Sequence, residues 1–181
     1  MTEKITRVFD CIEYQNCNYP QKEALVYKEN GKWISYSSEE FITIANQVSS
    51  SLLSLGIKPN DKIAIIVPVN HPKWHFLDIG ILQIGAQNVP LYATLSEKDY
   101  EYVLNHSDSK YCFIAGDDIY EKVNAVKSKT KLKEVYRLDN NSKIGWNSFL
   151  ELGKSKKIQS KIENIKNNIS PQDVATIIYT L

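Results

Sequence analysis

The sequence predicts an α/β fold of three layers, with a mostly parallel sheet flanked by helices and a small β-hairpin near the N-terminus. Short apolar runs alternate along the chain with segments of helical periodicity, as in doubly wound sheets. The pair Asn30-Gly31 separates two short β segments, which is typical of a hairpin. The 181 residues, 43% of them apolar, suffice for one domain with one core.

The hairpin is expected over residues 24–36, because Asn30 and Gly31 readily take the two positive-φ positions of a type I′ turn. Ser37 is followed three residues later by Glu40, a capping box that predicts the start of a helix. Apolar residues then recur at helical spacing until Gly56, which is typical of a helix C-terminus.

The following segment predicts a βαβ unit. The apolar run 62–67 resembles a strand buried on both faces of a parallel sheet. Pro72 suits the first turn of a helix, and residues 74–86 are apolar nearly all round, which predicts a helix packed between other elements. A short strand at 88–91 completes the unit.

The same alternation continues through the second half of the chain. Ser96 with Asp99 predicts the cap of another helix. After it we expect, in order, strand 111–115, helix 119–126, strand 134–136 and a short helix at 146–152. Right-handed crossovers would complete a doubly wound sheet.

Residues 154–168 allow two interpretations. The segment is rich in Lys, Asn and Ser, as a solvated linker would be. Three isoleucines of the segment, with Ile169 just after it, nevertheless keep a narrow helical stripe, so we expect a surface helix.

Composition limits the classes of partner. Lys and Arg number 22 against 21 Asp and Glu, so no strong electrostatic field favours nucleic acid, and we expect small-molecule substrates.

The sequence has no run of about 18 apolar residues that would predict a membrane span, while peripheral membrane contact stays open. Three cysteines without metal-site spacing fit a reducing cytoplasm, where we expect the protein.

The end of the chain carries the strongest functional signal. The run 174–179 is expected to be a buried central strand, and the chain stops just after it. In open α/β sheets the ligand lies beyond the carboxyl ends of the strands, where phosphate loops occur. We therefore expect residues 1–181 to be one N-terminal domain or subdomain, truncated before a phosphate loop and exposing a surface prone to self-association.

Residues 173–180 (Asp-Val-Ala-Thr-Ile-Ile-Tyr-Thr) resemble the lead-in to the signature of the adenylate-forming (AMP-binding) superfamily, Tyr-Thr-Ser-Gly-Thr-Thr-Gly followed by Pro-Lys-Gly. Leu181 departs from the Ser of that signature, either as a vector-derived residue or as a genuine difference. The glycine loop itself is not in the sequence.

Upstream segments resemble the same family in order and spacing. Residues 56–66 are similar to its "G-x-x-x-G-D-x-V-A-I" strand entry, with Asn60 in place of Gly. Residues 70–74 (Asn-His-Pro-Lys-Trp) resemble its "N-x-P-E-W" helix start, and residues 85–91 its "G-A-x-x-V-P-L" segment. Residues 95–110 are most similar to long-chain fatty acid synthetases.

The resemblance implies that the parent protein is a long-chain fatty acid–CoA ligase. Such an enzyme joins the acid to AMP from ATP with Mg²⁺, releases pyrophosphate, and passes the acyl group to CoA. Only Tyr179 and Thr180 belong to the nucleotide-loop motif; no catalytic or metal-binding residue is carried over, and the chain alone is expected to be inactive. The alternatives are an adenylate-forming enzyme for another carboxylic acid, or a stand-alone, non-catalytic α/β binding domain.

Four other constellations have structural readings that we favour. His71 and His75 are four residues apart, as zinc ligands on a helix can be, but Pro72 stands where HExxH has its glutamate. We therefore expect His71 to lie near the helix N-cap and His75 to pack beside Trp74. Gly80 and Gly85 have the spacing of a Walker A loop, but we expect them to allow close helix packing. Asp117 and Asp118 could bind a metal, but acidic residues in the first turn of a helix oppose its dipole, and we expect that role. The run Lys154–Lys157 could contact phosphate, but we expect it to be solvated.

Overall fold

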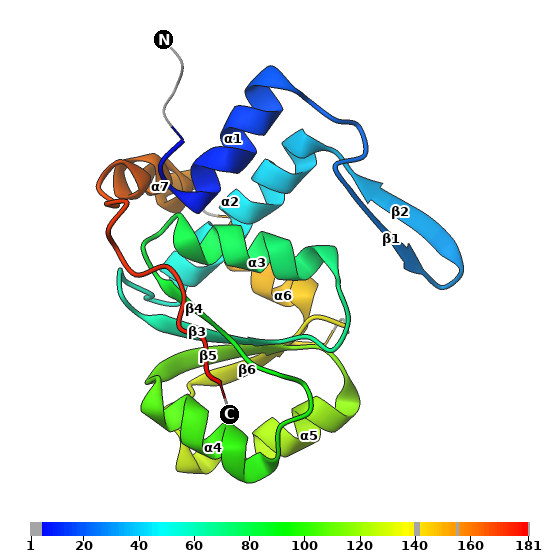
Figure 1. Cartoon of the computed structure of the whole chain (residues 1–181), viewed down its shortest axis with the longest axis vertical. Helices are drawn as coiled ribbons and strands as arrows, with labels where there is room; N and C mark the ends of the chain where they lie inside the picture. The colour runs from blue at the N-terminus through cyan, green and yellow to red at the C-terminus, as the bar shows by residue number, and fades with distance from the viewer. Residues whose placement is uncertain (1–4, 140–141, 155, 181) are drawn as a thin grey trace.

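A computed structural model describes residues 5–139, 142–154 and 156–180, with no side-chain description for 156–159. Its centre is a parallel sheet of four strands in the order β4-β3-β5-β6 (Figure 1). The strands of this sheet are β3 (Lys62–Ile66), β4 (Gln87–Pro90), β5 (Ser109–Ile114) and β6 (Glu134–Arg137). The predicted three-layer α/β fold is confirmed.

Helices cover both faces of this sheet (Figure 1). On one face lie α2 (Ser38–Ser54), α3 (Pro72–Leu82) and α6 (Trp146–Glu151). The other face carries α4 (Glu97–His106) and α5 (Asp117–Val126), the latter followed by a 3-10 turn at Lys127–Lys129. Two more helices, α1 (Val8–Asn18) and α7 (Lys156–Asn167), pack against α2.

Strand β3 is buried on both sides, as its apolar run predicts. Ile63 and Ile65 belong to the core under α2 and α3, whereas Ala64 and Ile66 belong to the core under α4 and α5. Side chains alternate between the faces of a strand, so this one segment supplies both cores. Each of the four is at most 1% exposed.

The hairpin is confirmed and extends away from the sheet (Figure 1). Strands β1 (Leu25–Glu29) and β2 (Lys32–Tyr36) pair antiparallel. Asn30 has φ 51° and Gly31 has φ 79°, the left-handed conformations of a type I′ turn.

Local capping signals start α2 and α4 and end α2 where the sequence predicts, whereas α3, expected to reach residue 86, ends at Leu82. The Ser37 side chain accepts the Glu40 N–H, and the Glu40 carboxylate accepts the Ser37 N–H, which completes the capping box of α2. The same exchange between Ser96 and Asp99 begins α4. Gly56 follows α2 with φ 79°.

Helix α7 is present, so the surface-helix interpretation holds and the linker interpretation is wrong. Its C-terminus is fastened to the start of the chain by Arg7. The Arg7 guanidinium donates to the carbonyl oxygens of Lys166 and Ile169 and pairs with Asp10. These bonds satisfy carbonyl groups that have no partner within a helix.

The prediction of a buried central strand at 174–179 is wrong. This segment lies beside the edge strand β4 and forms one parallel bridge, Thr176 with Asn88. Val174 is 56% exposed and Ile178 is 67% exposed, whereas Ala175, Ile177 and Tyr179 are half-buried against the protein. Because the described chain places a neighbour on only one side of the segment, only alternate side chains are covered.

A search of the described residues finds no helix that is long and apolar enough to cross a membrane.

Candidate functional site

The candidate site is the edge of the sheet where segment 174–180 runs along β4. The Asn88 N–H donates to the Ala175 carbonyl at 3.0 Å, and the Ile177 N–H donates to the Asn88 carbonyl at 2.9 Å. The Thr176 hydroxyl adds a third bond to the Asn88 carbonyl, at 3.1 Å. The bridge is parallel, as are the strands of the sheet, whose carboxyl ends form the side where ligands bind in open α/β sheets.

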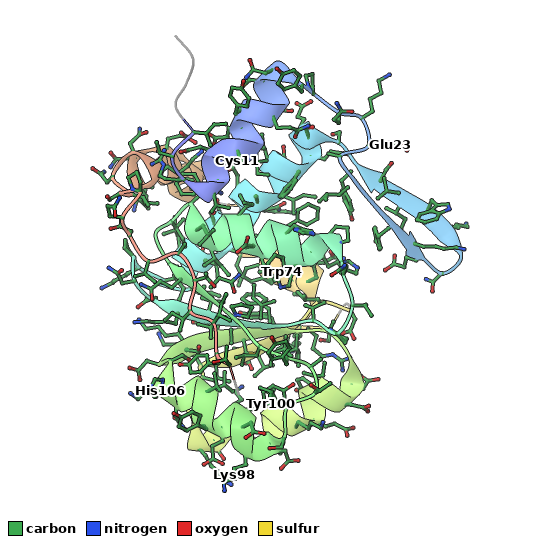
Figure 2. The ribbon with its side chains drawn as sticks, viewed as in Figure 1. Cys11, Glu23, Trp74, Lys98, Tyr100 and His106 are labelled. Atoms are coloured by element: carbon green, nitrogen blue, oxygen red, sulfur yellow. The ribbon has the colours of Figure 1, made fainter. Side chains whose placement is uncertain are left out.

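Tyr179, one of the two predicted site residues, is held by His106 at the end of α4. The Tyr179 hydroxyl lies 2.8 Å from His106 Nδ1, and the two rings meet nearly at right angles, with centroids 5.7 Å apart. Tyr102 stacks on the same imidazole at 5.6 Å. Figure 2 shows His106 on the helix beside which the chain ends. Burial, and then the neighbouring Tyr102, raise the pKa of Tyr179.

Thr180, the second predicted residue, follows Tyr179 and is exposed. Its position beyond the bridge to β4 leaves the hydroxyl accessible to solvent. Leu181 lies outside the described residues.

Behind the edge lies a polar pair, the buried Asn88 and the half-buried Asp78, that the sequence did not reveal. The Asn88 side-chain amide donates to Asp78 Oδ1 of α3 at 2.7 Å. Burial raises the pKa of Asp78, while the bond from Asn88 and the nearby His75 act in the opposite direction. Asn88 Oδ1 is buried without a hydrogen-bond partner among the described residues. The sequence does place one polar residue, Asn88, in a strand expected to be buried, which indicates that it needs a hydrogen-bond partner. It does not reveal that the partner is Asp78.

His71 and His75, which are spaced like zinc ligands, have the capping and packing roles that the sequence predicts. His71 is the N-cap of α3, where its Nδ1 accepts the Lys73 N–H at 3.1 Å. His75 packs edge-on against Trp74, which Figure 2 labels on α3, with ring centroids 5.4 Å apart. Over the part of the chain that the structure describes, no group of three or more His, Cys, Asp or Glu side chains could hold a metal ion.

The glycine spacing in α3 serves close packing. A Cβ atom on Gly80 would lie 2.5 Å from Val48 Cγ1 and 2.9 Å from the Ala45 carbonyl oxygen of α2. Gly85 has φ 70°, a conformation that L side chains rarely adopt. The packing interpretation is therefore confirmed for Gly80, whereas Gly85 lies in the turn after α3 and is required by its backbone conformation.

The described residues of the two charged runs have the structural roles that the sequence predicts. Asp117 and Asp118 lie in the first turn of α5, and Asp117 pairs with Arg137 at 2.6 Å. Lys154 pairs with Glu151 of the preceding helix at 2.6 Å. Ser155 and the side chains of residues 156 and 157 lie outside the described part.

Comparison with known proteins identifies what this architecture is similar to. The sequence model of the family described as AMP-binding enzyme matches residues 12–180. Fatty acyl-CoA synthetase A of Dictyostelium discoideum is 30% identical over 163 residues, which cover 82% of this chain and 23% of that protein. The human long-chain-fatty-acid–CoA ligase ACSBG2 is 26% identical over 164 residues, 87% of this chain and 24% of that protein.

Among solved structures, a long-chain-fatty-acid-CoA ligase (FadD1) from Archaeoglobus fulgidus matches 95% of this chain and 34% of its own, with a TM-score of 0.78. At 19% identity this likeness concerns the fold. The chain spans about a quarter of the length of the curated relatives it matches.

Proposed function

From the premise that this chain belongs to the AMP-binding enzyme family, we propose that it is the N-terminal part of an ATP-dependent long-chain fatty acid–CoA ligase. The parent enzyme would join a fatty acid carboxylate to the α-phosphate of ATP, releasing pyrophosphate. The CoA thiol would then displace AMP from the acyl adenylate and form the thioester. The names of the two relatives above support the choice of a fatty acid as substrate.

The observation that carries the proposal is the placement of Tyr179 and Thr180. The segment leading to them is bonded to β4 in parallel, the orientation of the sheet strands whose carboxyl ends form the ligand side of such sheets. The bond from Tyr179 to His106 holds the end of the segment against the C-terminal end of α4. This chain would thus supply the support of the phosphate loop.

The residues present do not form a nucleotide site by themselves. Stabilising a triphosphate requires several converging N–H donors, a cation and Mg²⁺. Here the Tyr179 hydroxyl is bonded to His106, and the exposed Thr180 hydroxyl is the other side-chain donor of the motif. In this proposal ATP, Mg²⁺ and CoA bind where the rest of the parent meets this edge, and the 181-residue chain alone is inactive.

The proposal also includes the setting of the enzyme. The three cysteines, Cys11, Cys17 and Cys112, are free thiols, which supports a reducing cytoplasm as the location. The substrates are small molecules, and the chain has a formal charge of only +1. We assign it no nucleic-acid partner.

The experiment is an ATP–pyrophosphate exchange assay on the parent protein, expressed from the complete reading frame, with acetate, benzoate, decanoate and palmitate as acids. We expect exchange with the long-chain acids and formation of the CoA thioester when CoA is added. The 181-residue chain, assayed in parallel, should give no exchange. Exchange with benzoate alone would move the assignment to another acid, and a parent with no exchange and no glycine-rich loop after Thr180 would overturn the ligase assignment.

A further inference from the structure

A second cleft lies at the carboxyl ends of β3, β5 and β6, beneath the hairpin. Its volume is about 640 Å³, within the range of small-molecule sites. No residue of segment 174–180 lines it. Its polar and aromatic lining includes Tyr27, Tyr36, His71, Lys73, Asp139 and Trp146.

The topology of the sheet singles out this position. The chain leaves β3 for α3 on one face, and it leaves β5 for α5 on the other, although the two strands are neighbours (Figure 1). Loops that diverge in this way open a crevice, the switch point at which open α/β sheets bind ligands. Val67 and Pro68 after β3, and Ala115 and Gly116 after β5, line the cleft.

Lys73 brings a positive charge into the cleft without a bound counter-ion. Its ammonium donates to the Leu138 carbonyl oxygen at 2.6 Å and lies 5.9 Å from the ring centre of Trp146. Within the described residues, no carboxylate forms an ion pair with Lys73; the Asp139 carboxylate, which follows β6, pairs with Arg137 and accepts the Gly116 N–H. Burial lowers the pKa of Lys73, partly opposed by Glu29 and Asp139. A half-buried ammonium in this state favours an anionic ligand.

His71 offers a second donor beside Lys73. Its Nδ1 accepts the Lys73 backbone N–H, so the neutral ring carries its proton on Nε2. Burial, and then the charge of Lys73, lower the pKa of His71, which favours this neutral form. The Tyr27 ring lies 4.7 Å from the His71 ring and stacks on Tyr36 at 6.2 Å, forming an aromatic wall.

The charges around the cleft narrow the ligand class. Glu29 and Asp139 also line it, and a polyphosphate would bring several negative charges close to both. A single carboxylate can approach Lys73 with less repulsion. The aromatic rings and the side chains of Val67, Val69 and Leu138 suit an apolar body.

We propose that this cleft binds a small monocarboxylate, whose carboxylate accepts from Lys73 Nζ and His71 Nε2 and whose apolar body packs against Trp146. The site is separate from the edge that carries Tyr179, so the proposal does not depend on the ligase function.

The test is calorimetric titration of the 181-residue chain with 2-naphthoate, with neutral 2-naphthamide and with inorganic pyrophosphate. We expect 2-naphthoate to bind at least about ten-fold more tightly than either comparator, because only it combines one charge with an apolar body. Lys73→Gln should weaken naphthoate binding by about ten-fold, since a charge-assisted hydrogen bond is lost. Lys98→Gln, the same change at an exposed lysine on α4 (Figure 2), should leave it unchanged.

Two further measurements separate loss of the site from loss of the fold. Lys73→Arg keeps the charge and should retain most of the binding, and the thermal unfolding of both Lys73 variants is compared with the wild type. Saturating 2-naphthoate should shift the NMR signal of the Trp146 indole N–H. Equal binding of acid and amide, equal binding by Lys73→Gln and wild type, absence of binding, or shifts confined to Tyr179 and His106 would each overturn the proposal.

Discussion

At the scale of single residues, the absence of one side chain sets the distance between two helices. Gly80 lets α3 approach α2 so closely that a methyl group would overlap Val48 and the Ala45 carbonyl. Interiors packed at crystal density have little room to relax around an added atom. In the sequence such glycines appear only as a spacing, whereas the contact between the helices is a property of the folded chain.

Gly80→Ala is therefore expected to lower the free energy of unfolding by about 1–3 kcal/mol, as overpacking typically does. Urea unfolding of the 181-residue chain measures this loss. Gly56→Asn is the matched control, because nothing lies within 4 Å of its Cβ position and Asn tolerates the left-handed conformation. Equal stability of wild type and Gly80→Ala would contradict the packing role.

Asp78 gives a prediction about pH. Burial raises its pKa in the folded state above the unfolded value, so its contribution to stability is complete below the unfolded pKa and is lost as pH rises through the folded pKa. At neutral pH the half-buried carboxylate of Asp78 is consequently unfavourable. Asp78→Asn should be more stable than the wild type at about pH 7, because Asn can still accept the bond from Asn88.

Urea unfolding of both proteins at about pH 7 and about pH 3.5 tests this, and the advantage of the variant should disappear at the lower pH. Asp118→Asn, an exposed change in the first turn of α5, serves as the control for removing a negative charge. A variant that is less stable at neutral pH would show that Asp78 is stabilised by its partners more than it is destabilised by burial.

At the scale of elements, the sequence predicted what local chemistry determines. Ser37, Pro72 and Ser96 mark helix starts by bonds or dihedral restrictions within a few residues, and the structure has all three helices. The match of the family over residues 12–180 likewise confirms the family predicted from ordered motifs.

Segment 174–179 shows where this reasoning fails. Its apolar composition predicts a strand, but burial depends on neighbours on both sides, and the described chain supplies only β4. The pairing of Asn88 with Asp78, and of Tyr179 with His106, joins residues that are 10 and 73 positions apart. No local pattern encodes such contacts, so the site could be predicted only as far as its two motif residues.

His106 is expected to hold segment 174–180 on the sheet. His106→Ala removes the hydrogen bond and the aromatic contact that the imidazole makes with Tyr179. The Ile177 amide should therefore exchange with solvent about five-fold faster in native-state hydrogen exchange, the equivalent of about 1 kcal/mol. Lys98→Ala, an exposed change on the same helix, should leave the rate unchanged. Tyr179→Phe combined with His106→Ala should add little to the single change, and full additivity would contradict a direct bond.

At the scale of the whole molecule, the sheet separates two cores, and among the described residues segment 174–180 is the one that pairs with its β4 edge. Val174 and Ile178 face outward from that segment. Exposed apolar side chains on an extended edge favour pairing with another chain.

We therefore expect the 181-residue chain to self-associate at high concentration through this segment. Light scattering after size exclusion should show a larger mass that falls toward the monomer in Ile178→Lys, because a charge on an edge opposes pairing. Tyr19→Lys, at a similarly exposed aromatic residue beyond α1, is the control and should not change the mass. A wild type that stays monomeric would show that the segment is adequately covered.

The bonds from Arg7 to Lys166 and Ile169 join positions 159 and 162 residues apart. Contacts between such distant positions require a large loop to close, which raises contact order and slows folding. A chain emerging from the ribosome could not form them until the residues through Ile169 had been synthesised. The hydrogen bonds from Arg7 to the C-terminus of α7 would thus form among the last events of folding. Until they form, chaperones could bind the incompletely folded chain.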